Sequence, residues 1–209
     1  GMTAAVVEAT FTPLRAELTK LVAEVAASKA KVSTKCLSVE IEPERQHAFG
    51  LWVLGQMGFD LKAGRLDTTT HPFCSGFAPG DTRLTTRYRD EKFTDALYGT
   101  MHEAGHGLYE QGLPADHFGT PCGSYCSLGV HESQSRLWEN QVGRGRPFWE
   151  HFFPRARQTF PAALRDVTLD AWLFAVNDVR PSFIRVEADE ATYNLHIILR
   201  FELEQALLT

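Results

Sequence analysis

Two histidines stand four positions apart in the stretch Tyr98–Gly112, which reads YGTMHEAGHGLYEQG. On a helix, residues four apart lie one turn apart on the same face, so His102 and His106 can direct their imidazole rings at a single ion. Imidazole is a good zinc ligand, and Glu103 lies beside that face, where it can act as a general base toward a water molecule activated by the metal. The pentapeptide His-Glu-x-x-His therefore indicates either a metal site that cleaves peptide bonds or a helix that carries two histidines by chance.

A catalytic zinc ion takes three protein ligands and leaves a fourth position to water or substrate, so a third ligand is expected. The stretch LGVHESQSRLWEN predicts a helix after the turn-forming segment TPCGSYC, far enough downstream to pack against the first helix. Glu132 on that helix would complete a His, His, Glu set. His131 is the rival ligand, but adjacent helix positions do not face one point. We therefore favour a role for His131 in orienting a carboxylate or in the core.

The elements that must position these residues are mainly helices. Two threonine-rich stretches between Arg65 and Tyr88, RLDTTT and RLTTRY, predict short strands that form a β-hairpin or a short sheet. No repeat, low-complexity tract or linker divides the sequence, which predicts one mainly α domain over residues 1–209. The helical spacing of apolar residues predicts helices over 13–31, 43–57, the His102 segment, 128–142, 147–153, 169–176 and 189–208.

Composition and charge exclude several classes of protein. Hydrophobic residues make up 44% and charged residues 22%, which is typical of a folded chain. The net charge of -5 and the scattered basic residues do not form the positive surface that nucleic acid or an anionic membrane needs. No apolar run approaches the roughly 20 residues of a membrane span, and the N-terminus lacks the pattern of a secretion signal, so we expect a cytoplasmic protein. Gly1 before Met2 is interpreted as a tag remnant.

The motif HEAGH followed by HESQSRLWEN resembles the M32 family of metallocarboxypeptidases, the Taq-type carboxypeptidases. Three further stretches follow the family's order: HPF at His71–Phe73, DTRLT at Asp81–Thr85 in the form Asp-x-Arg-x-Thr, and IRVEAD at Ile184–Asp189 in the form Ile-Arg-x-x-Ala-Asp. The resemblance implies a helical, zincin-like metallopeptidase core. It also implies an enzyme that removes single residues from peptide C-termini with broad specificity and commonly forms homodimers.

By this resemblance, His102, His106 and Glu132 hold the metal and Glu103 is the general base and acid. We expect the metal to be Zn²⁺, with Co²⁺ or another divalent ion as the alternative. The substrates would be peptides with a free C-terminal carboxylate.

Recognition of that carboxylate calls for an arginine, because the planar guanidinium binds a carboxylate through two parallel hydrogen bonds. Arg83 and Arg185, each inside a matched motif, are the candidates. The alternative for each is a structural ion pair, with Asp81 and Asp189 respectively. His71 is interpreted as a group that faces the substrate or supports the metal site, or as a core histidine. We expect Asp81, Thr85 and Asp189 to hold the framework of the site.

Members of the family are longer than this chain, and their downstream motif Gly-x-x-Gln-Asp-x-His-Trp has no counterpart in it. Three functional hypotheses therefore stay open. The chain is a shortened but working metallocarboxypeptidase, a metal-binding scaffold or partner-binding module without efficient catalysis, or a zinc aminopeptidase or endopeptidase with the same ligand set. The intact Glu103 favours the first hypothesis, because a purely structural zinc ion has no use for a base beside it.

Overall fold

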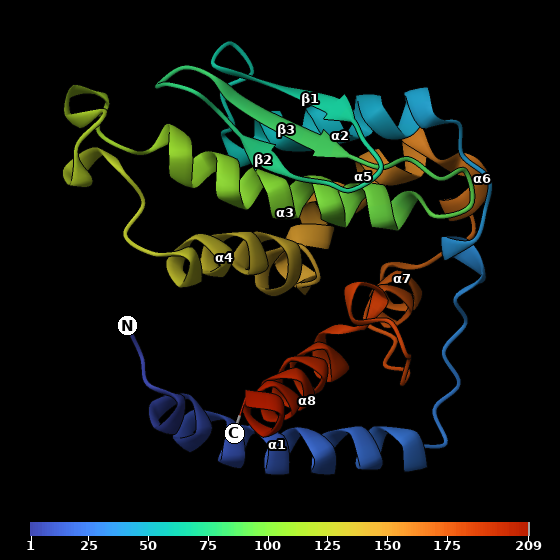
Figure 1. Ribbon diagram of the computed structural model, residues 1–209. Coiled ribbons are helices and arrows are strands. Elements are labelled where there is room, and N and C mark those ends of the chain that lie inside the picture. Colours follow the sequence, from blue (N-terminus) through green and yellow to red (C-terminus); the bar gives the residue numbers. More distant parts are fainter. Residues whose placement is uncertain (209) are drawn as a thin grey trace. The chain divides into compact units, whose positions relative to one another are not determined.

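A computed structural model describes residues 1–208, apart from the side chain of Glu187. Helices dominate this described chain, which divides into two compact units, one of residues 33–176 and one of residues 1–32 together with the residues from 177 onward (Figure 1). The mainly α fold with a small sheet is confirmed. The single domain over the whole chain stays a prediction. In the described part of the chain, no helix has both the length and the apolar character that crossing a membrane requires.

A three-stranded sheet packs against helix α3 in the larger unit (Figure 1). Its order is β1-β3-β2, and the central strand β3 is buried at four of its five positions. The two outer strands pair with β3 in opposite senses, β1 parallel and β2 antiparallel. The strands are β1 Gly64–Thr68, β2 Cys74–Ser75 and β3 Thr82–Thr86.

The two threonine-rich stretches do form strands, but they are parallel neighbours, with Gly64 opposite Thr82 and Thr68 opposite Thr86. The segment between them is long enough to carry the chain back to the starting end of the sheet, as a parallel pair requires. On the way it contributes Cys74–Ser75, a strand that the sequence texture does not predict. The hairpin of this sheet is therefore formed by β2 and β3.

Helices α3, Phe93–Gln111, and α4, Leu128–Arg136, lie side by side (Figure 1). The start of α4 is capped by the hydroxyl of Ser127, which accepts a hydrogen bond from the backbone N–H of Val130 at 3.1 Å. After Arg136 the chain continues as a π-helix, Leu137–Val142. The predicted helix over 128–142 is thus present, but its last six residues are wound more loosely than an α-helix.

Gly105 sets the distance between α3 and α4. A Cβ atom at this position would lie 2.5 Å from the carbonyl oxygen of Gln134 and 2.5 Å from Cα of Ser135, closer than real Cβ atoms approach. Only glycine lets the two backbones meet at this point. Because Gly105 lies inside the pentapeptide itself, the contact brings the α4 helix directly against the turn of α3 that carries His102 and His106.

An aromatic core joins the remaining elements of the larger unit. The rings of Trp149 and Trp172 are 4.7 Å apart, those of Phe93 and Phe160 are 4.8 Å apart, and all four side chains are buried. The elements that contribute to this unit beside those above are helices α2 Pro43–Met57, α5 Arg146–Thr159, α6 Pro161–Leu164 and α7 Leu169–Val176, and the 3-10 turns Lys35–Leu37, Ala115–His117 and Pro121–Gly123.

The smaller unit pairs helix α1, Ala4–Ala27, with helix α8, Glu190–Leu208 (Figure 1). The rings of Phe11 and Phe201 meet edge to face at 5.4 Å. A 3-10 turn, Arg185–Glu187, precedes α8.

Two helix predictions need correction, and one short helix is not predicted. Helix α1 begins at Ala4 and contains Pro13, which the sequence predicts as its first residue. Packing against α8 compensates for the backbone hydrogen bond that this proline removes. Helix α5 likewise runs past Pro154 to Thr159, and its buried face continues at Ala156 beyond the predicted end. The short helix α6 is too brief for apolar periodicity to reveal.

Candidate metal centre

His102, His106 and Glu132 bring three potential ligand atoms within 4.8 Å of one another. The Nε2 atoms of His102 and His106 lie 3.7 Å and 3.4 Å from Oε2 of Glu132. In a tetrahedral zinc site with bonds of about 2.0–2.1 Å, ligand atoms stand about 3.3–3.4 Å apart. The two spacings between a histidine and Glu132 are therefore close to those of a tetrahedral zinc site.

Glu139, which lies in the π-helix, contacts the far side of the His102 ring. Its Oε2 atom is 2.8 Å from Nδ1 of His102 and also accepts a hydrogen bond from Arg136 at 2.6 Å. Burial opposes a charge on His102, but the hydrogen bond and the nearby carboxylates outweigh it and raise the pKa of the imidazole. Glu139 thus orients the ring with Nε2 toward Glu132 and makes it a stronger base.

A second chain of polar contacts supports His106. Its Nδ1 atom is 2.6 Å from Nδ1 of His131, and Nε2 of His131 is 2.6 Å from Oε1 of Glu110. The His131 ring is packed edge-on against Tyr109 and Tyr125, at 5.1 Å and 5.2 Å. Both ring nitrogens of His131 therefore contact other groups, which supports the prediction that His131 does not bind the metal itself.

These contacts fix the proton positions if Nε2 of His106 binds a metal. Nδ1 of His106 must then carry its proton and donate it to Nδ1 of His131. His131 in turn carries its own proton on Nε2 and donates it to Glu110. The relay Glu110–His131–His106 and the pair Glu139–His102 both end in a carboxylate, the arrangement that commonly orients histidine ligands of metals.

Glu103 is buried, with 6% of its surface exposed, on the α3 turn between the two histidines. Burial raises the pKa of its carboxyl group, the charged forms of His102 and His106 oppose the rise, and the carboxylates of Glu132 and Glu139 add to it. The net effect is a pKa above the usual value of a glutamate. A carboxylate of raised basicity beside a metal site is suited to accept a proton.

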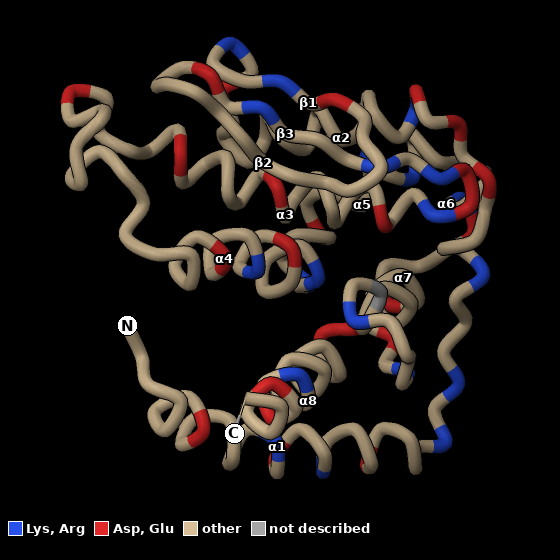
Figure 2. Tube along the Cα trace, viewed as in Figure 1, with Lys and Arg blue, Asp and Glu red and all other residues tan. Residues whose placement is uncertain are grey.

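Negative charge is concentrated around the ligand group. Helix α3 carries Asp95, Glu103 and Glu110 and no lysine or arginine, as the red positions along it show (Figure 2). Burial works to raise the pKa of Glu132, but the hydrogen bond from His106 and the charge on His102 outweigh it, so the pKa is lowered. Glu132 therefore stays ionised and available to a cation.

The residues of the Asp-x-Arg-x-Thr motif lie on and next to strand β3. Nε of Arg83 donates a hydrogen bond to Asp81 at 2.8 Å, and its guanidinium lies 5.2 Å from the ring centre of Phe77. Thr85 is buried, and its hydroxyl accepts a hydrogen bond from the backbone N–H of Phe73 at 2.9 Å and donates one to the Phe73 carbonyl at 3.1 Å. These contacts hold β2 against β3.

His71 is exposed in the loop between β1 and β2, so it is not a core histidine. Arg185 and Asp189 belong to the smaller unit. There Arg185 donates a hydrogen bond to the hydroxyl of Tyr193, and Asp189 caps helix α8 by accepting hydrogen bonds from the backbone N–H groups of Ala191 and Thr192, each at 3.0 Å. A role for Asp189 in the framework of the metal site stays a prediction.

Sequence reasoning misses two carboxylates of this centre, Glu110 and Glu139. Glu110 follows His106 by four residues, and Glu139 follows Glu132 by seven, so each lies on the same helix face as a candidate ligand. That spacing is a signal that can be read from the sequence. The spacing does not show which residue of the neighbouring helix each carboxylate contacts.

Comparisons with known proteins decide the family. The model of the carboxypeptidase Taq (M32) metallopeptidase family matches residues 1–209. The chain belongs to this family. It is 54% identical over 207 residues to thermostable carboxypeptidase 1 of Thermus thermophilus, covering 99% of this chain and 40% of that protein. It is 41% identical to carboxypeptidase 1 of Bacillus subtilis, again over 99% of this chain and 41% of the relative.

Comparison with solved structures identifies the same family. The M32 carboxypeptidase from Deinococcus radiodurans R1 matches with a TM-score of 0.95 and 50% identity, over 100% of this chain and 42% of that one. The carboxypeptidase of Pyrococcus furiosus matches with a TM-score of 0.94 and 37% identity, over 100% of this chain and 42% of that one. The chain thus spans about two fifths of the length of these relatives. Membership of a metallopeptidase family implies a divalent metal ion, which the ligand group described above fits.

Proposed function

We propose that this chain carries the metal centre of a metallocarboxypeptidase, which hydrolyses the last peptide bond of substrates with a free C-terminus. The observation that carries the proposal is the convergence of His102, His106 and Glu132 beside the buried Glu103. The names of its relatives, all carboxypeptidases, support the substrate class. We propose zinc as the metal, because two imidazoles and one carboxylate with an open fourth position are typical of catalytic zinc sites.

A divalent ion at this centre supplies Lewis-acid activation of water and of the scissile carbonyl. Glu103 accepts a proton from the attacking water, whose oxygen bonds to the carbonyl carbon. It then passes that proton to the departing amine nitrogen as the C–N bond breaks. The raised pKa of Glu103 suits both roles, since the group must take the proton and release it again.

For the terminal carboxylate we propose an arginine, with Arg83 and Arg185 as the candidates and His71 as a further contact with the substrate. Arg83 uses Nε toward Asp81, so a substrate carboxylate would bind at the Nη groups of its guanidinium. Fixing that carboxylate would set the cleavage at the last bond. We keep the homodimer as a proposal that rests on the family resemblance, and the cytoplasmic location as one that rests on the sequence patterns alone.

The test is release of C-terminal amino acids by the chain loaded with Zn²⁺ or Co²⁺, using matched peptides with a free or an amidated C-terminus. We expect release only from the free peptides, and a loss of about 10²–10⁴-fold in Glu103→Gln with metal content unchanged. Glu40→Gln, an exposed carboxylate of the same unit, is the matched control and should retain activity.

Other outcomes would contradict the proposal in distinct ways. Cleavage of amidated peptides would indicate an endopeptidase or aminopeptidase. A folded chain that holds one ion and releases nothing would indicate a metal-binding scaffold.

A further inference from the structure

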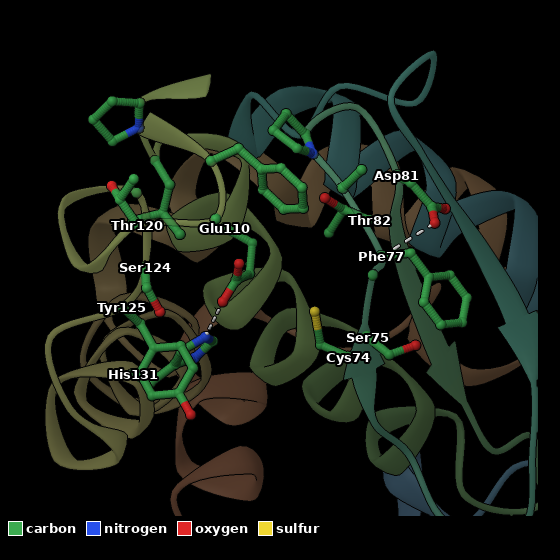
Figure 3. Close-up of a pocket in the computed structure, with 18 of the residues that line it drawn as sticks. Cys74, Ser75, Phe77, Asp81, Thr82, Glu110, Thr120, Ser124, Tyr125 and His131 are labelled. Atoms are coloured by element: carbon green, nitrogen blue, oxygen red, sulfur yellow. Dashed lines mark hydrogen bonds and ion pairs between the residues drawn. The ribbon is translucent and has the colours of Figure 1, made fainter. Parts of the chain in front are cut away.

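A cavity of about 680 Å³ lies beside the metal centre, between strand β2 with the loop that follows it and the segment that joins α3 to α4 (Figure 3). Its volume is within the range of about 300–1,000 Å³ that is usual for small-ligand sites. His131 lines the cavity and also contacts the candidate ligand His106. The cavity therefore adjoins the candidate metal centre through His131, while none of the three candidate ligands lines it.

The walls of the cavity are largely apolar. Phe77, Leu113, Pro114, Phe118 and Tyr125 contribute to them. Aromatic and aliphatic walls of this kind suit the methylene stem of a long side chain, and the two phenylalanines expose 79% and 57% of their surfaces.

Two carboxylates line the cavity and stand on opposite sides of it (Figure 3). Among the described residues that line it, Asp81 and Glu110 are the carboxylates, and none is lysine or arginine. Asp81 is already paired with Arg83 and also accepts from the backbone N–H of Phe77 at 3.3 Å. Glu110 uses only Oε1, toward His131, so within the described chain its Oε2 atom is left for a ligand (Figure 3).

Glu110 is held in place before any ligand arrives. Its bond to His131, and the packing of that ring against Tyr109 and Tyr125, hold the carboxylate in place in the lining of the cavity. The thiol of Cys74, which also lines the cavity, responds to this field, since burial, followed by the charges of Glu103 and Glu110, raises its pKa to about 12. A fixed negative group beside apolar walls is complementary to an ammonium or guanidinium group on a hydrocarbon stem.

We propose that this cavity binds a lysine or arginine side chain of the peptide substrate, with Glu110 as the residue that recognises its charge. The choice of a peptide as ligand rests on the proposed peptidase function. The binding site itself is defined by the cavity and its charges, so it can be tested without any cleavage.

The experiment measures binding of blocked amino acids to the metal-loaded chain by protein-observed NMR. Nα-acetyl-lysine methylamide is compared with Nα-acetyl-norleucine methylamide, which has a similar stem but no charge. We expect the lysine compound to bind about five- to tenfold more tightly at low salt, as a half-exposed charge-assisted hydrogen bond allows, and this preference to shrink at high salt. Equal affinity for the two compounds in the wild-type chain would overturn the proposal.

Three variants test which residue causes the preference for the lysine compound. In Glu110→Gln the ratio of the two affinities should fall to about one, while the side-chain amide oxygen still accepts the hydrogen bond from His131. Phe118→Ala should weaken the binding of both compounds to a similar extent, because both lose the contact between their hydrocarbon stem and the phenyl ring. Asp116→Asn, an exposed carboxylate on the neighbouring turn that does not line the cavity, should leave the preference unchanged.

A preference that survives Glu110→Gln, or that disappears in Asp116→Asn, would contradict the assignment. None of these readouts depends on catalysis. If the chain bound the lysine compound with this selectivity but released no amino acid, the peptidase proposal would be wrong and the proposed binding site would still hold.

Discussion

At the scale of single residues, we expect the proposed metal centre to depend on groups that would not touch the ion. Glu139 fixes one face of His102, and Glu110 acts on His106 through His131. Each imidazole is thereby held in the tautomer that leaves Nε2 free for a metal. Removing such a supporting carboxylate typically costs ten- to a hundredfold in metal affinity.

Glu139→Gln should therefore bind zinc about ten- to a hundredfold more weakly at alkaline pH, where His102 is unprotonated. Its pH dependence should also change. In the wild-type chain the raised pKa of His102 means that a proton competes with the metal, and affinity falls about tenfold per pH unit below that pKa. The variant loses the contact that raises the pKa, so its decline should begin at lower pH.

Competitive chelator titrations across pH would measure both effects, with Glu40→Gln as the control. An unchanged alkaline affinity, or a decline that begins at the same pH as in the wild-type chain, would show that Glu139 does not act on His102 as described.

The sequence predicts best those parts of the candidate centre whose residues are close together in the chain. His102, Glu103 and His106 lie in one helical turn, and their spacing alone places them together. Glu132 required the further inference that two helices pack, and the structure places it 3.4 Å from His106. The contact of Glu110 with His131 depends on the register between the two helices, which no periodicity encodes.

At the scale of elements, the packing of α4 on α3 decides whether a ligand group exists. The decisive residue is Gly105, where a side chain would collide with the backbone of Gln134 and Ser135. The π-helix that follows α4 then presents Glu139 to His102. Windings of this kind are frequent at functional sites.

Gly105→Ala should lower the free energy of unfolding by about 1–3 kcal/mol, since an inserted methyl group forces the two backbones apart. It should also weaken metal binding, because Glu132 moves away with α4. Gly55→Ala is the matched control: Gly55 lies inside helix α2, where a Cβ atom would meet no other atom within 4 Å, and alanine there should stabilise the fold by about 0.5–1 kcal/mol.

Denaturant unfolding and zinc titration of both variants would check this pair of predictions. If Gly105→Ala were as stable as Gly55→Ala and bound zinc normally, the close approach of the helices would not be what positions Glu132.

The sheet shows where sequence reasoning at this scale fails. Threonine-rich texture identifies β1 and β3, but a parallel pairing depends on the path of the segment between them. The π-helix is equally hidden, since its residues continue an ordinary helical pattern. The cavity depends on the path of that segment too, because its walls come from the β2 region and from the segment before α4.

At the scale of the whole molecule, folding and metal binding should be linked. The candidate ligands come from two helices that are far apart in an unfolded chain, so an ion that binds only the folded form stabilises it. At a free zinc concentration of about a hundred times Kd, the free energy of unfolding rises by about 2.7 kcal/mol.

Hydrogen exchange with and without zinc should show this gain as slower exchange of the amides in α3 and α4. Glu132→Gln, which weakens one of the three ligands, should reduce the effect markedly, whereas Glu40→Gln should preserve it. Equal protection of these helices in the presence and absence of zinc would mean that the ion does not join them.

The most direct measurement is the metal stoichiometry of the purified chain after zinc loading and removal of excess ion. We predict one ion per chain in the wild-type protein and in Glu103→Gln, and an affinity at least about a hundredfold lower in His106→Ala and Glu132→Ala. Binding of no ion by the folded wild-type chain, or equally tight binding by Glu132→Ala, would contradict the assignment of His102, His106 and Glu132 as the metal centre.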